Sequence, residues 1–193
     1  GLAGVSESDD FGNERLALGL CMRFPHLLDR HYERFSRLPF ANDLHRRFRD
    51  VLCRIVDELE GTPIADLTSA YDESLRDLMY EMRLETIGLQ QQKGAVFSVL
   101  NHRFPVLKSN PPEDFIEAVY LHLLDVLELN ALEEELSSEL ASAEEQFDED
   151  AWTRIQALTQ DLSRRREECA RDEAELAERA KKIRTAPPVA AAQ

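Results

Sequence analysis

Apolar residues recur every three or four positions along most of the chain, which is the spacing of helices that bury one face. The first apolar row begins at Asn13, and Pro25 either ends its helix or opens a second one, which we place over residues 26–38. Asn42 or Asp43 is a suitable N-cap for a third helix. These rows predict helices rather than strands.

The third helix should stop at Gly61, because glycine commonly ends helices. Further helices are predicted from Thr62, over residues 71–88 and over residues 95–104. Together these segments predict a compact bundle of five or six helices.

A pair of prolines, Pro111 and Pro112, interrupts the pattern, and two acidic residues follow it, as is typical of a helix start. One long helix is predicted from Glu113 to about Phe147. Its apolar row has steps of three or four throughout: Phe115, Val119, Leu123, Val126, Leu129, Leu132, Leu136, Leu140, Ala143 and Phe147.

A second long helix is predicted after the acidic turn at residues 148–150, and it ends before Pro187. It carries one apolar residue in every seven, namely Ile155, Leu162, Cys169, Leu176 and Ile183, supported by Trp152, Leu158 and Ala180. Two long helices joined by so short a turn must pack antiparallel as a hairpin roughly 50 Å long. The tip of this hairpin must project from the bundle.

The predicted fold is therefore all-α, a multi-helix bundle followed by a long antiparallel helical hairpin. We divide the chain into a disordered tail or linker over 1–12, the bundle over 13–112, the connecting helix and hairpin over 113–185, and a disordered tail over 186–193.

The net charge of −15 is concentrated in one segment. Residues 113–150 contain 14 acidic and no basic side chains, whereas residues 1–112 contain 17 acidic and 14 basic ones. Such a segment repels phosphate backbones and anionic lipid surfaces, so direct binding of nucleic acid or membrane is disfavoured. The acidic run is either a solvated helix face or a recognition surface for a protein partner.

Cys21, Cys53 and Cys169 show neither metal-ligand nor disulfide spacing, which favours a reducing cytosol. No apolar run is long enough to cross a bilayer, and the N-terminus lacks the pattern of a signal peptide. The first residue is not Met, from which we expect a fragment of a longer protein.

Motifs of known enzymes are absent: the chain has no phosphate-binding loop, no GxGxxG, no HExxH and no GxSxG. We expect no catalytic, cofactor or metal site. Asp148 to Asp150 fits helix capping better than magnesium binding, and Arg164 to Arg166 fits helix-spaced ion pairs better than a nucleic-acid patch. The histidines are scattered, so surface or capping roles are expected for all of them: His26, His31, His45, His102 and His122.

Three segments, in this order, resemble the C-terminal helicase-binding domain of bacterial DnaG-type primases. Residues 13–28 resemble its opening helix, which runs into a short motif with proline and leucine, here Phe24 to Leu28. Residues 115–129 are similar to its long connecting helix. Residues 147–165, with Trp152, are similar to its terminal hairpin.

The resemblance implies a non-catalytic domain that docks primase onto the N-terminal domains of the hexameric DnaB-type replicative helicase in the bacterial cytoplasm during DNA replication. The parent protein would be a DNA-directed RNA polymerase of the primase type, with its zinc-binding and catalytic domains upstream. The family also leaves open a contact between the bundle and single-stranded-DNA-binding protein. Carried over by position, the helicase-binding residues would be Trp152, Ile155, Leu158, Gln160, Leu162 and Arg164.

The chain departs from the family in two ways. It continues in helical pattern past Arg165, where the simplest family members stop, and the acidity of residues 113–150 is unusually strong. Two other hypotheses stay open. The chain could be the N-terminal domain of the helicase itself, which would assemble into a ring, or a coiled-coil scaffold that dimerises through the row from Ile155 to Ile183. The primase hypothesis predicts a monomer.

Overall fold

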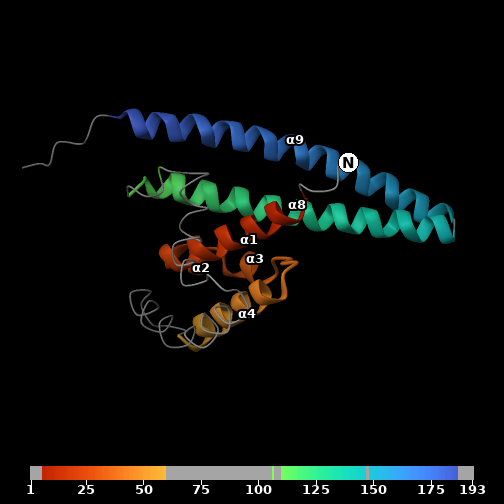
Figure 1. Ribbon diagram of the computed structural model, residues 1–193, viewed down its shortest axis with the longest axis horizontal. Helices are drawn as coiled ribbons and strands as arrows, with labels where there is room; N and C mark the ends of the chain where they lie inside the picture. The colour runs from red at the N-terminus through yellow and green to blue at the C-terminus, as the bar shows by residue number, and fades with distance from the viewer. Residues whose placement is uncertain (1–5, 60–105, 107–109, 147, 187–193) are drawn as a thin grey trace, which may run out of the picture.

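The computed structural model describes residues 6–59, 106, 110–146 and 148–186, and all regular elements within these ranges are helices. The predicted all-α fold, a bundle followed by a long antiparallel hairpin, is confirmed (Figure 1). In chain order the helices are α1 (Ser6–Arg23), α2 (Pro25–Arg30), α3 (Tyr32–Ser36), α4 (Asp43–Glu58), α8 (Glu113–Glu145) and α9 (Glu149–Thr185).

Helices α1 to α4 pack on one another and form the described part of the bundle. Pro25 is the first residue of α2, where its missing N–H costs nothing. Asn42 caps α4 as predicted, because its side-chain oxygen accepts from the backbone N–H groups of Leu44 and His45 at 2.9 and 3.1 Å. The bundle thus follows the local signals of the sequence at these two boundaries.

Helix α8 lies between the bundle and α9 (Figure 1). Asn110 has a φ of 49°, a left-handed conformation that asparagine tolerates, and Pro112 is the N-cap residue of α8. The first half of α8 is buried on several sides at once, with Phe115, Tyr120 and Leu123 all 0% exposed. This half of α8 is therefore part of the central core.

Helix α9 runs antiparallel to α8 along its whole length (Figure 1). At about 1.5 Å per residue, 33 residues of α8 and 37 of α9 give a hairpin roughly 50 to 55 Å long. We call residues 113–129 and 170–185 its bundle half, and residues 130–146 and 148–169 its tip half. The tip half extends beyond the bundle (Figure 1).

The end of α9 that exceeds the family pattern is not a free extension. Leu176 is 4% exposed and belongs to the central core, and Ala180 and Ile183 pack against that core. The Arg179 guanidinium lies 5.5 Å from the ring centroid of Phe115 and forms an ion pair with Asp114 at 3.0 Å. The last turns of α9 therefore hold α8 from the side opposite the bundle.

Some predicted boundaries were wrong. Helix α1 begins at Ser6, inside the segment 1–12 that we predicted as a tail. The helix predicted over 26–38 is two helices, because His31 has φ −119° and ψ 26°, outside the helical region. Helix α4 ends at Glu58, before the predicted stop.

The helices predicted from Thr62, over 71–88 and over 95–104, together with Gly61 and Phe147, lie outside the described residues. Within the described ranges, no helix has both the length and the apolar character needed to span a membrane.

Candidate functional site: the tip of the hairpin

The turn between α8 and α9 is closed by a helix cap and a small apolar seam. Asp148 is the N-cap residue of α9, and its Oδ1 accepts from the backbone N–H of Ala151 at 2.5 Å, as predicted. Ala151, Ile155 and Leu162 are each 4 or 5% exposed and pack inside the hairpin. The tip half is therefore an ordered helical pair with its own buried seam.

Two large apolar side chains of the tip half are nevertheless exposed, Leu140 by 44% and Trp152 by 48%. They lie at the same level of the hairpin, because Arg154 and Glu139, their near neighbours in sequence, form an ion pair at 3.4 Å. No other large hydrophobic residue of the described chain is so exposed.

The same ion pair shows which flank the two side chains occupy. Successive residues of an α-helix are about 100° apart, so Trp152 lies about 160° from Arg154 and Leu140 about 100° from Glu139. Because the ion pair closes one flank of the hairpin, Trp152 and Leu140 both face the other, which we call the Trp152 flank.

The Trp152 flank continues toward the bundle with a second ion pair. Arg166 lies about four turns along α9 from Trp152, and its guanidinium contacts Glu133 on α8 at 2.7 Å. An apolar pair at the end of the hairpin is thus followed by a charged pair on the same side.

The six residues carried over from the family do not lie together on one surface. Ile155 and Leu162 are buried against α8, and Leu158 is half-buried at the edge of that seam. Gln160 and Arg164 are exposed, about 80° and 120° around the helix from Trp152. A partner could contact the exposed side chains of Trp152, Gln160 and Arg164 directly. Ile155 and Leu162 instead hold the two helices together inside the hairpin.

Arg164 is held by two acidic residues of its own helix. Its guanidinium contacts Asp161 at 2.5 Å and Glu168 at 3.2 Å, and the hydrogen bond to Asp161, with the charge of Glu168, raises the Arg164 pKa. Arg165 also contacts Asp161, at 3.1 Å. Helix-spaced ion pairs were predicted for this run with Glu167 and Glu168 as the partners. Glu168 is one partner, whereas the others are Asp161 of the same helix and Glu133 of α8.

The acidic run of residues 113–150 has two different environments. In the bundle half, Arg30 contacts Glu113 and Glu117 at 3.2 and 2.8 Å, and Arg34 contacts Glu128 at 2.8 Å and also Asp125. These contacts tie the bundle to α8. In the tip half, several acids, among them Glu134, Glu135, Glu144 and Glu145, are exposed.

The histidines were only partly predicted. His31 Nε2 lies 2.8 Å from Glu117 Oε1, and this hydrogen bond, with the charge of Arg30, lowers the Glu117 pKa. His45 and His122, however, are 1% and 3% exposed, so the prediction of surface roles was wrong for them. Each of them occupies a helix position that faces the core, and nothing in the neighbouring sequence distinguishes that position from an exposed one. His102 lies outside the described residues.

No group of three or more His, Cys, Asp or Glu side chains in the part of the chain that the structure describes could hold a metal ion. Cys21 is buried, and its Sγ donates to the Tyr120 hydroxyl at 3.2 Å. Burial raises the pKa of this thiol to about 12, which makes it a poor nucleophile.

Leu140 is the surface residue that sequence reasoning missed, because it continues the apolar row of α8 without a break. The available signal was its position: Leu140 lies past the bundle, where only α9 covers α8. Comparison with protein-family models, with curated proteins and with solved structures gave no match.

Proposed function

We propose that this chain is the non-catalytic helicase-binding domain of a bacterial DnaG-type primase. In this proposal the hairpin tip docks onto the N-terminal domains of the hexameric replicative helicase. The observation that carries the proposal is the tip that extends beyond the bundle (Figure 1), where Trp152 and Leu140 are both exposed at the same level of the hairpin. Large apolar groups on an exposed end are common anchors of protein interfaces.

The primase resemblance and the tip geometry support each other. The resemblance assigns the partner contact to the terminal hairpin, and the hairpin tip is where the described chain exposes its large apolar side chains. Exposed Gln160 extends this surface along α9, and Arg164 borders it. Because a hairpin end buries limited area, we expect moderate affinity.

The burial of its proposed seam within one chain argues against the coiled-coil alternative. Its proposed dimer seam runs from Ile155 to Ile183. Within one chain Ile155, Leu162 and Leu176 are each 4% exposed, and Cys169 and Ile183 are half-buried. A dimer through this row would require the hairpin to open. We therefore expect a monomer.

Co-elution from a sizing column with light-scattering detection tests the proposal. The chain alone should elute as a monomer, and a mixture with the N-terminal domain of the replicative helicase from the same organism should give a heavier complex. A ring formed by the chain alone would favour the helicase-domain alternative. Absence of a complex at tens of micromolar would contradict the proposal.

A further inference from the structure

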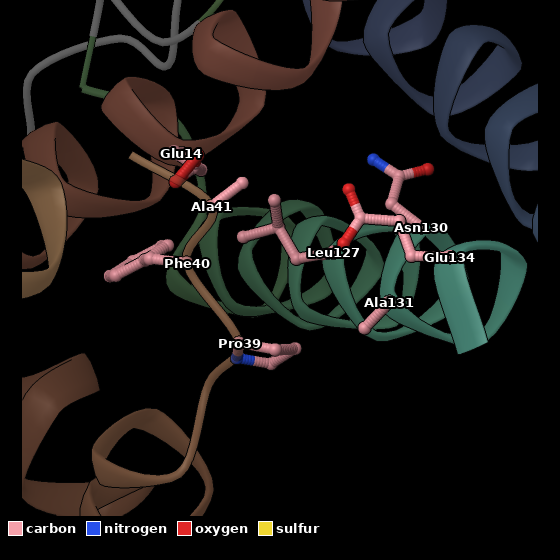
Figure 2. A pocket seen from close by; sticks show the side chains of 8 residues that line it. All are labelled: Glu14, Pro39, Phe40, Ala41, Leu127, Asn130, Ala131 and Glu134. Atoms are coloured by element: carbon pink, nitrogen blue, oxygen red, sulfur yellow. The ribbon is translucent and has the colours of Figure 1, made fainter. Parts of the chain in front are cut away.

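A small groove lies where the hairpin leaves the bundle (Figure 2). Its volume is about 90 Å³. One wall is formed by Glu14 of α1 and by Pro39, Phe40 and Ala41 of the loop between α3 and α4, and the other by α8, through Leu127, Asn130, Ala131 and Glu134.

Glu14 is an unusual residue for such a place, because it is a carboxylate that is only 1% exposed. Its Oε1 accepts from the backbone N–H of Asn42 at 3.1 Å and lies 3.6 Å from His45 Nδ1. Its Oε2 is buried and has no hydrogen-bond partner. A buried carboxylate oxygen without a donor is costly, so this site favours the arrival of one.

The charge around the groove selects the kind of donor. The α8 wall contributes a second carboxylate, Glu134, and α8 has no lysine or arginine anywhere in its 33 residues. Arg15, beside Glu14 in sequence, is directed to His45, since its Nε donates to His45 Nε2 at 3.4 Å. The groove is therefore acidic, and a cation is the complementary ligand.

The rest of the lining selects the shape of that cation. Pro39, Leu127 and Ala131 provide apolar surface for a hydrocarbon stem (Figure 2), and the volume suits one head group or a few water molecules rather than a helix. A guanidinium has five donors in one plane, so it can satisfy two carboxylates on opposite walls, which three ammonium donors do less well.

We propose that this groove binds one arginine side chain presented by a basic segment of a partner protein. The guanidinium lies between the Glu14 and Glu134 carboxylates, and its stem rests on Pro39 and Leu127. The inference does not depend on the function proposed for the tip, because it uses another surface and another kind of contact.

The test is NMR titration of the whole chain with N-acetyl-arginine amide, with N-acetyl-lysine amide and N-acetyl-norleucine amide as comparison ligands. The arginine amide should shift the methyl signals of Leu127 and Ala131 in a saturable way. The lysine amide should bind more weakly, and the norleucine amide should cause no saturable shift.

Two variants locate the site. Glu14→Gln keeps an oxygen for Asn42 but removes the charge, and Glu134→Gln removes the second carboxylate. Each should weaken arginine binding about tenfold or more, the loss expected for one charged hydrogen bond. Glu144→Gln, an exposed acid of α8 far from the groove, is the matched control and should leave binding unchanged.

Circular dichroism checks that each variant is folded, and if Glu14→Gln is not, exposed Glu134→Gln still decides the result. Equal shifts with arginine and norleucine amides would overturn the proposal, as would arginine shifts that survive both substitutions. No saturable shift by the arginine amide at tens of millimolar would overturn it as well.

Discussion

The bundle half and the tip half of the hairpin carry the same apolar spacing but are covered differently. In the bundle half, α8 lies between the bundle and α9, and Phe115 and Leu123 are 0% exposed. In the tip half past Glu134, α9 is the one described helix that covers α8, and Leu140 is 44% exposed. The apolar row of α8 therefore has a structural role at one end and is available to a partner at the other.

The charged residues follow the same division. Acidic residues of the bundle half pair with Arg30 and Arg34, and these contacts fix the hairpin to the bundle. In the tip half the ion pairs between described residues join α8 to α9 or lie within α9. The bundle half is therefore expected to determine stability, and the tip half recognition.

The largest expected effect compares Phe115→Ala with Leu140→Ala. Removing the fully buried ring should lower the free energy of unfolding by about 3 to 5 kcal/mol, because it leaves a cavity in the central core. Removing the exposed leucine should cost less than about 1 kcal/mol. Urea denaturation measures both, and similar losses for the two variants would contradict the division of the hairpin.

The contacts between the end of α9 and the central core give the next largest expected effect on stability. Leu176→Ala should lower the free energy of unfolding by about 2 to 4 kcal/mol, because the side chain is 4% exposed in the core. Its neighbour Ala177 is exposed, so Ala177→Ser is a matched control that should change stability by less than about 0.5 kcal/mol. Denaturation curves that match for the two variants would show that the end of α9 does not hold α8.

High pH should destabilise the bundle half through the buried pair of Cys21 and Tyr120. Burial raises the pKa of Cys21 to about 12, and burial together with the neighbouring thiol raises the pKa of Tyr120 above its ordinary value of 10.0. Above these ordinary values the unfolded chain loses protons that the folded chain keeps. Stability from this pair is therefore complete below about pH 9 and falls as the pH rises.

Tyr120→Phe isolates one of these groups. Between pH 10 and 11 the free energy of unfolding of the parent should fall by up to about 1.4 kcal/mol more than that of the variant, because only the parent has the Tyr120 proton to lose on unfolding. Urea denaturation at both pH values measures this difference. Parallel losses in parent and variant would mean that Tyr120 titrates alike in both states.

The smallest expected effect compares two helix caps. Asn42→Ala should lower the free energy of unfolding by about 1 kcal/mol, because the Asn42 side chain accepts hydrogen bonds from two backbone N–H groups at the start of α4 in the bundle. Asp148→Ala should cost less in global unfolding, because the cap lies at the exposed turn of the tip, where local fraying precedes unfolding. Hydrogen exchange near Ala151 should accelerate in the Asp148 variant even where the denaturation midpoint is unchanged.

Local signals in the sequence predicted much of this fold. Of the seven-residue row on α9, Ile155, Leu162 and Leu176 are buried, and Cys169 and Ile183 are half-buried. The caps at Asn42 and Asp148 were predicted because capping depends on residues close in sequence.

The features that the sequence could not predict depend on whether segments distant in sequence bury a residue. Leu140 and Leu123 look alike in the apolar row, but their exposure differs because the bundle reaches only one of them. The burial of His45 and His122 has the same kind of cause, since it depends on packing with other helices.

The most direct test of the docking claim is calorimetric titration of the chain into the N-terminal domain of the replicative helicase. Parent chain, Trp152→Ala, Leu140→Ala and Gln160→Ala/Arg164→Ala would be compared with Arg154→Ala, which alters the opposite flank at the same level. The account predicts micromolar binding that Trp152→Ala and Leu140→Ala each weaken at least tenfold, with Arg154→Ala near the parent. Binding that is absent, or equally strong in all these variants while they remain folded, would contradict it.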